Sequence, residues 1–453
     1  MSRFGADPDE LTLANREFTL RFPGEGAARQ PVHTVYGGGH RFRADTVPRL
    51  GRLGLEALEE YGGGPEEFAA AVGLTPQLAG AVHRRIREKL VREPVEDFRI
   101  DFEDGYGHRS DPEEDGHVAE AAVRVAEGMR AGTLPPFIGI RVKPLNEELR
   151  RRSDRTLEIF LRTLVERSGT APSGLVVTLP KVTLPAQVAH AARLLDQLEE
   201  RLRLEQGAVT LEIMVELPQA IIGPRGHCPL VELVAAGNGR VRGAHFGTYD
   251  YTAGLGITAA WQRMGHPACD FAKQVMQVTL AGTGVWLSDG ATGIMPVPLH
   301  RAPEGGSLSP RQMAENRAGV HRAWALHYAD VRHSLETGFY QGWDLHPAQL
   351  PTRYGAVFAF FLEGLEAAGE RLRNFLAKAA QATLVGDVFD DAATGQGLLN
   401  YFLRAINSGA VGQDEVGRMT GLTTEDLRSR SFARILASRR DGSEEGKGKN
   451  PNA

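Results

Sequence analysis

Residues 98–105 read Phe-Arg-Ile-Asp-Phe-Glu-Asp-Gly, a short apolar run whose end carries acidic side chains. Its first five residues have the length and the aromatic and β-branched content typical of a β-strand. Successive side chains of a strand point to opposite faces, so Asp101 and Glu103 are expected on one face. The stretch therefore predicts a strand with a pair of carboxylates at its carboxyl end.

Runs of the same kind recur on both sides of this stretch. The polar residues that end six of them follow one another at a nearly constant step of about 35–40 residues, the length of one strand, one helix and two loops. Amphipathic helical periods fill the intervals, for example over 146–167 and 187–204. Eight such units between residues 31 and 350 predict a closed (β/α)8 barrel, the TIM barrel of the α/β class. The runs cover 32–36, 98–102, 137–142, 175–179, 211–217, 241–246, 284–287 and 342–345.

The rest of the chain is interpreted as additions to this barrel. Residues 1–30 are expected to form an N-terminal arm, and 50–95 a helical insertion after the first strand. The pattern after residue 350 is helical, so 351–438 are expected to form a C-terminal helical extension. Residues 439–453 have no apolar side chain before Ala453, which predicts a disordered tail.

Composition excludes several classes of protein. The chain has 453 residues, of which 42% are hydrophobic and 24% charged, a globular balance. Its formal net charge of -5 argues against a nucleic-acid partner. The two cysteines match no zinc or redox spacing, no apolar stretch is long enough to cross a membrane, and the first 30 residues lack a signal sequence. We therefore expect a cytoplasmic protein without a membrane partner.

Charged residues at neighbouring strand ends form a candidate metal site. Glu216 ends the run Leu-Glu-Ile-Met-Val-Glu, and Asp250 follows the next strand. The strand ends of a TIM barrel surround one site, so the two carboxylates are expected to lie close together. Carboxylates without nitrogen or sulfur ligands suit Mg²⁺ or Mn²⁺. The alternative is a solvated acid at each strand end.

Three acidic residues, Asp101, Glu103 and Asp104, form what we call the acidic cluster. Carboxylates beside a metal could hold its water molecules or orient a nearby cation, which makes the cluster a catalytic candidate. The alternative is a structural group of salt bridges with Arg99 and Arg109.

Basic residues end other strands. Arg141, in Ile-Arg-Val, has the planar fork that suits a substrate carboxylate, and its alternative is an ion pair with the acidic cluster. Lys181, in Leu-Pro-Lys-Val, and His346, in Leu-His-Pro-Ala-Gln, are also assigned to substrate binding. Their alternatives are a surface lysine and a packed histidine. The glycine run 37–39 is a weak candidate for cradling an anion.

The order of these motifs resembles a known family. Asp-Phe-Glu-Asp-Gly, Ile-Arg-Val, Leu-Pro-Lys-Val, Met-Val-Glu-Leu-Pro, Phe-Gly-x-x-Asp and Leu-His-Pro-Ala-Gln are similar to the motifs of the citrate lyase β subunit and malyl-CoA lyase group of aldolases. That group lies within the phosphoenolpyruvate/pyruvate TIM-barrel superfamily, and the resemblance covers about residues 31–350. It implies that Glu216 and Asp250 are metal ligands and that Arg141 binds substrate, and it places the acidic cluster in the family's strand-2 motif.

The resemblance implies a divalent-metal-dependent carbon–carbon lyase or condensing enzyme. Its substrate would be a small carboxylate, either a 2-oxo acid or a hydroxy-acyl compound such as a CoA thioester. The metal and Arg141 would stabilise the enolate that forms. Two alternatives stay open. One is a phosphoenolpyruvate-utilising phosphotransferase, for which the sequence lacks a phosphate-binding loop motif, and the other is a non-catalytic binder of a 2-oxo acid or acyl thioester.

No strand-end residue is an evident general base. Asp390 and Asp391 lie between two apolar helical stretches of the extension. In related lyases, by resemblance, a C-terminal acid of a neighbouring subunit can complete the active site. We therefore expect a homo-oligomer in which this loop supplies the base, with a solvated turn that caps the next helix as the alternative.

Overall fold

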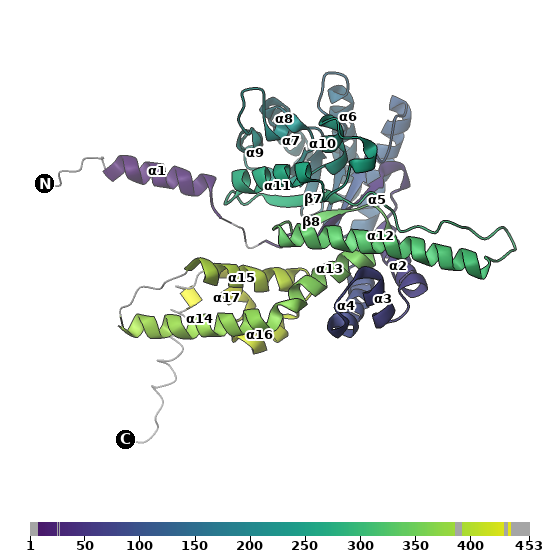
Figure 1. Cartoon of the computed structure of the whole chain (residues 1–453). Coiled ribbons are helices and arrows are strands. Elements are labelled where there is room, and N and C mark those ends of the chain that lie inside the picture. The colour runs from purple at the N-terminus through teal and green to yellow at the C-terminus, as the bar shows by residue number, and fades with distance from the viewer. Residues whose placement is uncertain (1–7, 25, 27, 386–391, 430–433, 436–453) are drawn as a thin grey trace.

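The computed structural model describes residues 8–24, 26, 28–385, 392–429 and 434–435. Its centre is a closed barrel of eight parallel strands in sequence order, which confirms the predicted (β/α)8 fold (Figure 1). Each predicted apolar run contributes one strand. The strands are β1 (His33–Gly38), β2 (Asp97–Asp101), β3 (Phe137–Arg141), β4 (Leu175–Leu179), β5 (Thr210–Val215), β6 (Val241–Phe246), β7 (Trp286–Ala291) and β8 (Gln341–Asp344).

Helices surround the barrel, and the expected insertion and extension are both helical. The barrel helices are α5 (Asp111–Ala131), α6 (Arg150–Ser168), α7 (Pro185–Leu202), α8 (Pro218–Ile221), α9 (Leu230–Ala236), α10 (Thr248–Gly254), α11 (Pro267–Leu280) and α12 (Pro310–Glu336). The insertion holds α2 (Thr46–Ala57), α3 (Pro65–Val72) and α4 (Ala79–Arg92). The extension holds α13 (Leu350–Glu363), α14 (Leu365–Val385), α15 (Ala392–Asn407), α16 (Gln413–Thr420) and α17 (Thr424–Ser429). Short helical turns are η1 (Gly39–Arg41), η2 (Leu58–Gly62), η3 (Pro76–Leu78), η4 (Ala259–Trp261) and η5 (Pro347–Gln349).

The N-terminal arm and the C-terminal extension contain helices whose bounds the sequence pattern did not give. The N-terminal arm contains α1 (Pro8–Arg21), which projects away from the barrel and is exposed along its length from Glu10 onward (Figure 1). The apolar stretch after β8 is divided between α13 and α14 at Gly364. Asp390, Asp391 and the tail 439–453 lie outside the described residues. Among the described helices, none combines the length and the apolar content that a membrane span requires.

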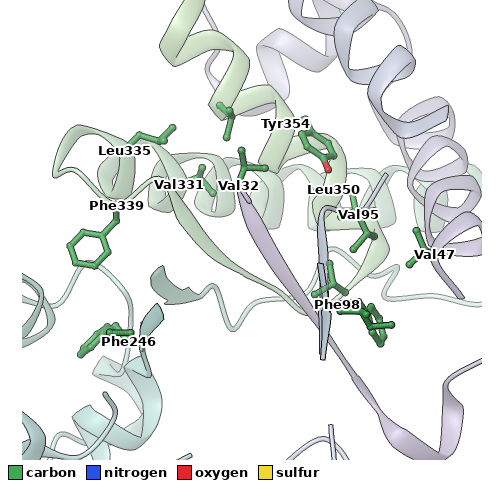
Figure 2. Close-up of a cluster of buried hydrophobic side chains, with 14 of the residues drawn as sticks. Val32, Val47, Val95, Phe98, Phe246, Val331, Leu335, Phe339, Leu350 and Tyr354 are labelled. Carbon is green, nitrogen blue, oxygen red and sulfur yellow. The ribbon is translucent and has the colours of Figure 1, made fainter. Parts of the chain in front are cut away.

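Alternation along the strands separates an apolar layer from a charged barrel interior. On β2, Phe98 and Ile100 belong to the apolar layer between strands and helices, part of which Figure 2 shows. Asp97 and Arg99 point the other way, where they bond to side chains of β1, β4 and β5. Asp101 continues this inward series at the carboxyl end of the strand and hydrogen-bonds to β3. Because side chains alternate between the two faces of a strand, Asp101 lies on the inner face at the mouth of the barrel.

The strand register brings the predicted site residues to one edge. Asp101 of β2 lies opposite Arg141 of β3, and Val215 of β5 lies opposite Phe246 of β6. Because all strands are parallel, the residues that follow β5 and β6 leave the sheet at the same mouth as Asp101 and Arg141. This places Glu216 and the loop to Asp250 within the same site.

Replacing Gly139 with alanine is expected to destabilise the barrel by about 1–3 kcal/mol or more. A Cβ atom at Gly139 would lie 2.0 Å from the backbone oxygen of Val176 on β4, so the two strands would have to move apart. Gly116→Ala is the matched control, because no atom lies within 4 Å of a Cβ there and alanine favours a helix. Urea denaturation measures both variants. A Gly139→Ala protein as stable as the wild type would contradict this strand packing.

Candidate active site

One cavity of about 1120 Å³ opens at the carboxyl ends of the strands and continues along the loop after β1 to α2. Active sites of TIM-barrel enzymes lie at this end of the barrel, since the βα loops meet there. Most of the predicted site residues line this cavity, namely Asp101, Asp104, Arg141, Glu216, Asp250 and His346. The other two strand-end candidates, Glu103 and Lys181, form ion pairs with these groups.

Arg141 is held by the acidic cluster. Its Nε donates to Asp101 Oδ1 over 2.7 Å and its Nη2 to Asp101 Oδ2 over 2.6 Å, while Nη1 lies 3.0 Å from Glu103 Oε2. Burial lowers the pKa of Arg141, but the charge of Asp101 outweighs it and raises that pKa well above its ordinary value. The ion pair named as the alternative for Arg141 is thus present, and the guanidinium is a fixed positive charge.

Two aromatic rings support this guanidinium. Its central carbon lies 4.9 Å from the ring centroid of Tyr36 and 6.0 Å from that of Trp343, and the two rings are 4.6 Å apart. A cation above aromatic faces is stabilised by the negative charge density of the rings. Both aromatic residues line the cavity, so they form its floor beside Arg141.

Lys181 links the acidic cluster to the two predicted metal ligands. Its ammonium donates to Glu103 and lies 3.1 Å from Asp250 Oδ2, and its backbone N–H donates to Glu216 Oε1 over 2.7 Å. The φ angle of Lys181 is 53°, in the left-handed region that side chains other than glycine rarely adopt. This unusual turn is what aims the amide at Glu216, and strain of this kind is common at functional sites.

Glu216 has the most strongly perturbed carboxyl group of the cavity wall. It is 2% exposed, and burial raises its pKa to about 8 against the opposing charges of Lys181 and Arg141. Asp250 and Glu103 raise the pKa further because they are also acidic. A buried carboxyl group that also faces other carboxylates resists ionisation, because its negative charge is both removed from water and repelled.

The residues present fit a hard divalent cation. Glu216 and Asp250 offer oxygen atoms only, and the Lys181 ammonium beside Asp250 shows that a cation is accommodated there. Mg²⁺ often takes one or two protein carboxylates and keeps its remaining positions for water and substrate. No three or more His, Cys, Asp or Glu side chains are grouped to hold a metal within the described ranges. A metal would therefore depend on two protein ligands.

His346 lies on the same cavity and is oriented by the helical turn that follows it. Its Nδ1 accepts a hydrogen bond from the backbone N–H of Ala348 over 3.2 Å. A neutral imidazole whose Nδ1 accepts carries its proton on Nε2, so the free side of the ring is a donor. Burial lowers the pKa of His346, which favours this neutral form.

Some strand-end acids do not belong to the site. Asp289, on β7, accepts hydrogen bonds from Lys273 over 3.0 Å and from Ser334 over 2.7 Å, between the barrel and helices α11 and α12. It therefore stabilises the packing of helices on the barrel. Asp390 and Asp391, which were expected to supply a base, fall outside the described residues.

The glycine run after β1 serves packing. A Cβ at Gly37 would lie 2.8 Å from the Phe98 ring, and one at Gly39 would lie 2.5 Å from the Phe102 ring. These rings come from β2 and the residue after it, so the glycines allow β1 and β2 to lie close together. The anion cradle considered for this run has no support in these contacts.

Several cavity residues were missed from the sequence. Tyr36 and Trp343 lie inside predicted strands, where aromatic residues are expected for packing alone. His40 and Arg41 also line the cavity. They directly follow the glycine run at the end of a strand, and this position could have identified them as candidate site residues. Thr248 follows β6 in the same way.

A search of curated proteins gave no match. Among solved structures, the lead(II) complex of Haloferax volcanii malate synthase is similar, with 14% identity over 90% of this chain and 97% of that chain and a TM-score of 0.45. Mycobacterium tuberculosis CitE in complex with magnesium and acetoacetate shows 17% identity over 73% of this chain and 91% of that chain, with a TM-score of 0.38. A HpcH/HpaI aldolase/citrate lyase family protein from Burkholderia cenocepacia J2315 shows 14% identity over 79% and 99%, with a TM-score of 0.39.

These names include the citrate lyase and aldolase group that the motifs resemble. At such identities and TM-scores the similarities carry no argument about the reaction, which has to come from the residues of this chain. The match to a family model is broader, since it covers residues 11–435 and thus the barrel, the insertion and most of the extension. The chain belongs to the family described as DUF6986, a domain of unknown function.

Proposed function

We propose that this protein is a divalent-metal-dependent carbon–carbon lyase or condensing enzyme that acts on a 2-oxo acid. One observation carries the proposal. Two carboxylates, the buried Glu216 and the partly exposed Asp250, share a cavity with the fixed guanidinium of Arg141 at the carboxyl ends of a TIM barrel. Such an arrangement can stabilise an enolate, the intermediate common to cleavage and condensation next to a carbonyl group.

Glu216 and Asp250 would hold the Mg²⁺ or Mn²⁺ ion. When bound, the ion would withdraw electrons from the carbonyl group of the substrate and favour its enolate form. The raised pKa of Glu216 and the position of the Lys181 ammonium support this choice, because both indicate a place where added positive charge is favourable.

Arg141 would act on the enolate oxygen as a charge already in position. Its Nε and Nη2 are committed to Asp101, so the side chain offers no free fork for a substrate carboxylate. A guanidinium fixed by ion pairs and aromatic rings loses little freedom when charge develops beside it, and this preorganisation is the main source of electrostatic catalysis. Its proposed role is therefore catalytic more than substrate-binding.

The direct test is enolisation of pyruvate in deuterated water. The wild-type protein with Mg²⁺ or Mn²⁺ is expected to exchange the methyl protons of pyruvate, followed by NMR, and to lose this exchange after chelation. A panel of 4-hydroxy-2-oxo acids and hydroxy-acyl CoA thioesters then tests cleavage. Binding of oxalate without exchange or cleavage of any compound would favour the non-catalytic binder and overturn the proposal.

Arg141→Lys is expected to lower kcat for exchange by about 10²-fold or more, with a smaller change in KM. Lysine keeps the charge but cannot make the two parallel bonds to Asp101, so its ammonium would not be fixed in the same place. Arg155→Lys is the control, because Arg155 forms an exposed ion pair with Asp115 away from the cavity. Wild-type kinetics in Arg141→Lys would remove the arginine from the reaction.

The homo-oligomer remains a prediction. The apolar surface of α13 is buried within the chain, where the helix packs against α12 and α4. That surface therefore needs no second copy to cover it. A CoA thioester as substrate and a cytoplasmic location are likewise predictions.

A further inference from the structure

We propose that His40 is the general base of this reaction and that His346 is a fixed hydrogen-bond donor to the same substrate. The inference rests on the proposed function and fills the role for which the strand ends offered no residue. It is carried by the position of the two rings on one cavity and by the different hydrogen bonds of their nitrogen atoms.

The backbone after β1 places His40 at the barrel mouth. The residue lies in η1, directly after the strand, and lines the cavity that Arg141 and Glu216 also line. A Cβ at Gly38 would lie 2.8 Å from His40 Cε1 and 3.0 Å from His40 Nδ1, so the ring rests on the end of the strand. The absence of a side chain at Gly38 is therefore what lets the imidazole reach this position.

The nitrogen atoms of His40 are unused. Nδ1 is buried without a hydrogen-bond partner in the described structure, and no described residue bonds to Nε2. Other histidines nearby are committed, since His117 Nδ1 bonds to Tyr106 over 2.8 Å and His33 Nδ1 bonds to Asp344 over 2.7 Å. Because Nδ1 is buried, Nε2 is the nitrogen of this cavity-lining imidazole that can take a substrate proton.

The surroundings keep His40 neutral, the form that a base requires. Burial lowers the pKa of His40, and the positive charges of Arg109, Arg41 and Arg43 lower it further together with His117. The ring also packs edge-on against Tyr106 at 5.6 Å between centroids.

Nearby acids do not cancel this effect. Asp101 and Asp104 line the same cavity, but Asp101 is paired with Arg141, and Asp104 lies 3.5 Å from the Lys181 ammonium. Neither carboxylate is hydrogen-bonded to His40 in the described structure, so neither stabilises its protonated form directly.

His346 cannot take the same role in the conformation described. Its Nδ1 lone pair is used by the amide of Ala348, so its Nε2 carries the proton and donates. The two histidines thus have different roles in hydrogen bonding. His40 can accept a proton, whereas His346 donates its N–H group. A donor of this type suits a carboxylate or carbonyl oxygen of the substrate.

In pyruvate, a methyl C–H bond breaks, its proton moves to Nε2 of His40, and the electron pair forms the carbon–carbon double bond. The carbonyl π electrons move to oxygen, which becomes the enolate beside Arg141. The imidazolium then returns a proton, or a deuteron from the solvent, to the carbon. In the cleavage direction the same nitrogen accepts the proton of the substrate hydroxyl group.

The experiment compares His40→Gln, His40→Ala and His346→Gln with wild type in the pyruvate exchange assay. His40→Gln is expected to lose about 10²–10⁴-fold in kcat, because general-base catalysis contributes that much, while oxalate binding by calorimetry stays within a few-fold of wild type. Added imidazole is expected to restore exchange in His40→Ala in proportion to its neutral form. His346→Gln is expected to raise KM and weaken oxalate binding without rescue by imidazole. His108→Gln, an exposed histidine outside the cavity, is the control.

The outcomes separate the two proposals. If wild type exchanges pyruvate protons and His40→Gln does so at the same rate, or if imidazole gives no rescue, His40 is not the base although the proposed function stands. If wild type itself neither exchanges nor cleaves any compound of the panel, the proposed function fails and the assignment of His40 falls with it.

Discussion

Arg99→Met is expected to destabilise the protein by at least about 3–5 kcal/mol, a large part of the stability of an ordinary domain. Arg99 is fully buried inside the barrel, where it donates to Asp97, to Glu212 and, over 2.9 Å, to Thr178. Methionine fills most of the space but removes the guanidinium that pairs with both buried carboxylates, and of the two only Glu212 keeps a further basic side chain nearby in the described structure, Arg242 at 3.6 Å. The cost of that uncompensated charge exceeds the loss of packing.

Urea denaturation and thermal melting measure the effect. Arg155→Met, which breaks the exposed pair with Asp115, is the matched control and is expected to change stability little, because solvent screens an exposed ion pair. Asp97→Asn and Glu212→Gln, added to Arg99→Met, are expected to recover part of the loss because they remove the unpaired charges. A loss below about 1 kcal/mol in Arg99→Met would contradict the charged interior described here.

The barrel could be predicted because its signal is local and repeated. A strand such as 175–179 is a compact apolar run, and the step between runs reflects the length of one strand and one helix. The position of each site residue at a strand end follows from the same pattern. Asp101 and Arg141 could therefore be placed at one mouth without knowledge of their contacts.

The pairing of side chains could not be predicted in the same way. Whether Arg141 bonds to Asp101 or to a substrate depends on strand register and side-chain rotamers, which sequence spacing does not specify. Arg99 and Arg141 are two strand arginines of similar appearance, yet one fills the barrel interior and the other lies at the cavity. Lys181 contacts Asp250 from a backbone in the left-handed region, a conformation that its residue type does not indicate.

The helix α1 was missed for a different reason. Its residues from Glu10 to Arg21 are exposed, including the large apolar side chains of Leu11, Phe18 and Leu20, so no buried face imposes a clear amphipathic period. Periodicity identifies helices that pack against something. A helix that projects into solvent, such as α1, has no buried face, so hydrophobic periodicity does not reveal it.

Glu216→Gln is expected to abolish divalent-metal binding and to change how stability depends on pH. In the metal-free fold, burial holds the pKa of Glu216 at about 8, above the ordinary value of 4.5. The folded state therefore keeps a proton that the unfolded chain releases. Its contribution to stability is complete below about pH 4.5 and is lost as the pH rises through 8, by an amount of the order of a few kcal/mol. Glutamine stays neutral, so this part of the decline should disappear.

Mn²⁺ titration by calorimetry and melting curves from pH 5 to pH 9, with and without Mn²⁺, test both parts. Metal bound to the fold stabilises wild type by about 2.7 kcal/mol at a concentration of 100 times Kd, and Glu216→Gln should gain none of this. Asp250→Asn separates the two effects. It should lose metal affinity but keep most of the decline in stability towards pH 9, because burial of Glu216, the first cause of its raised pKa, is unchanged, while only the smaller contribution of the Asp250 charge is removed. Glu205→Gln, on the exposed surface, should leave both properties unchanged. Wild-type Mn²⁺ affinity in Glu216→Gln would show that the metal is held elsewhere, and an unaltered pH dependence would show that another group carries the proton.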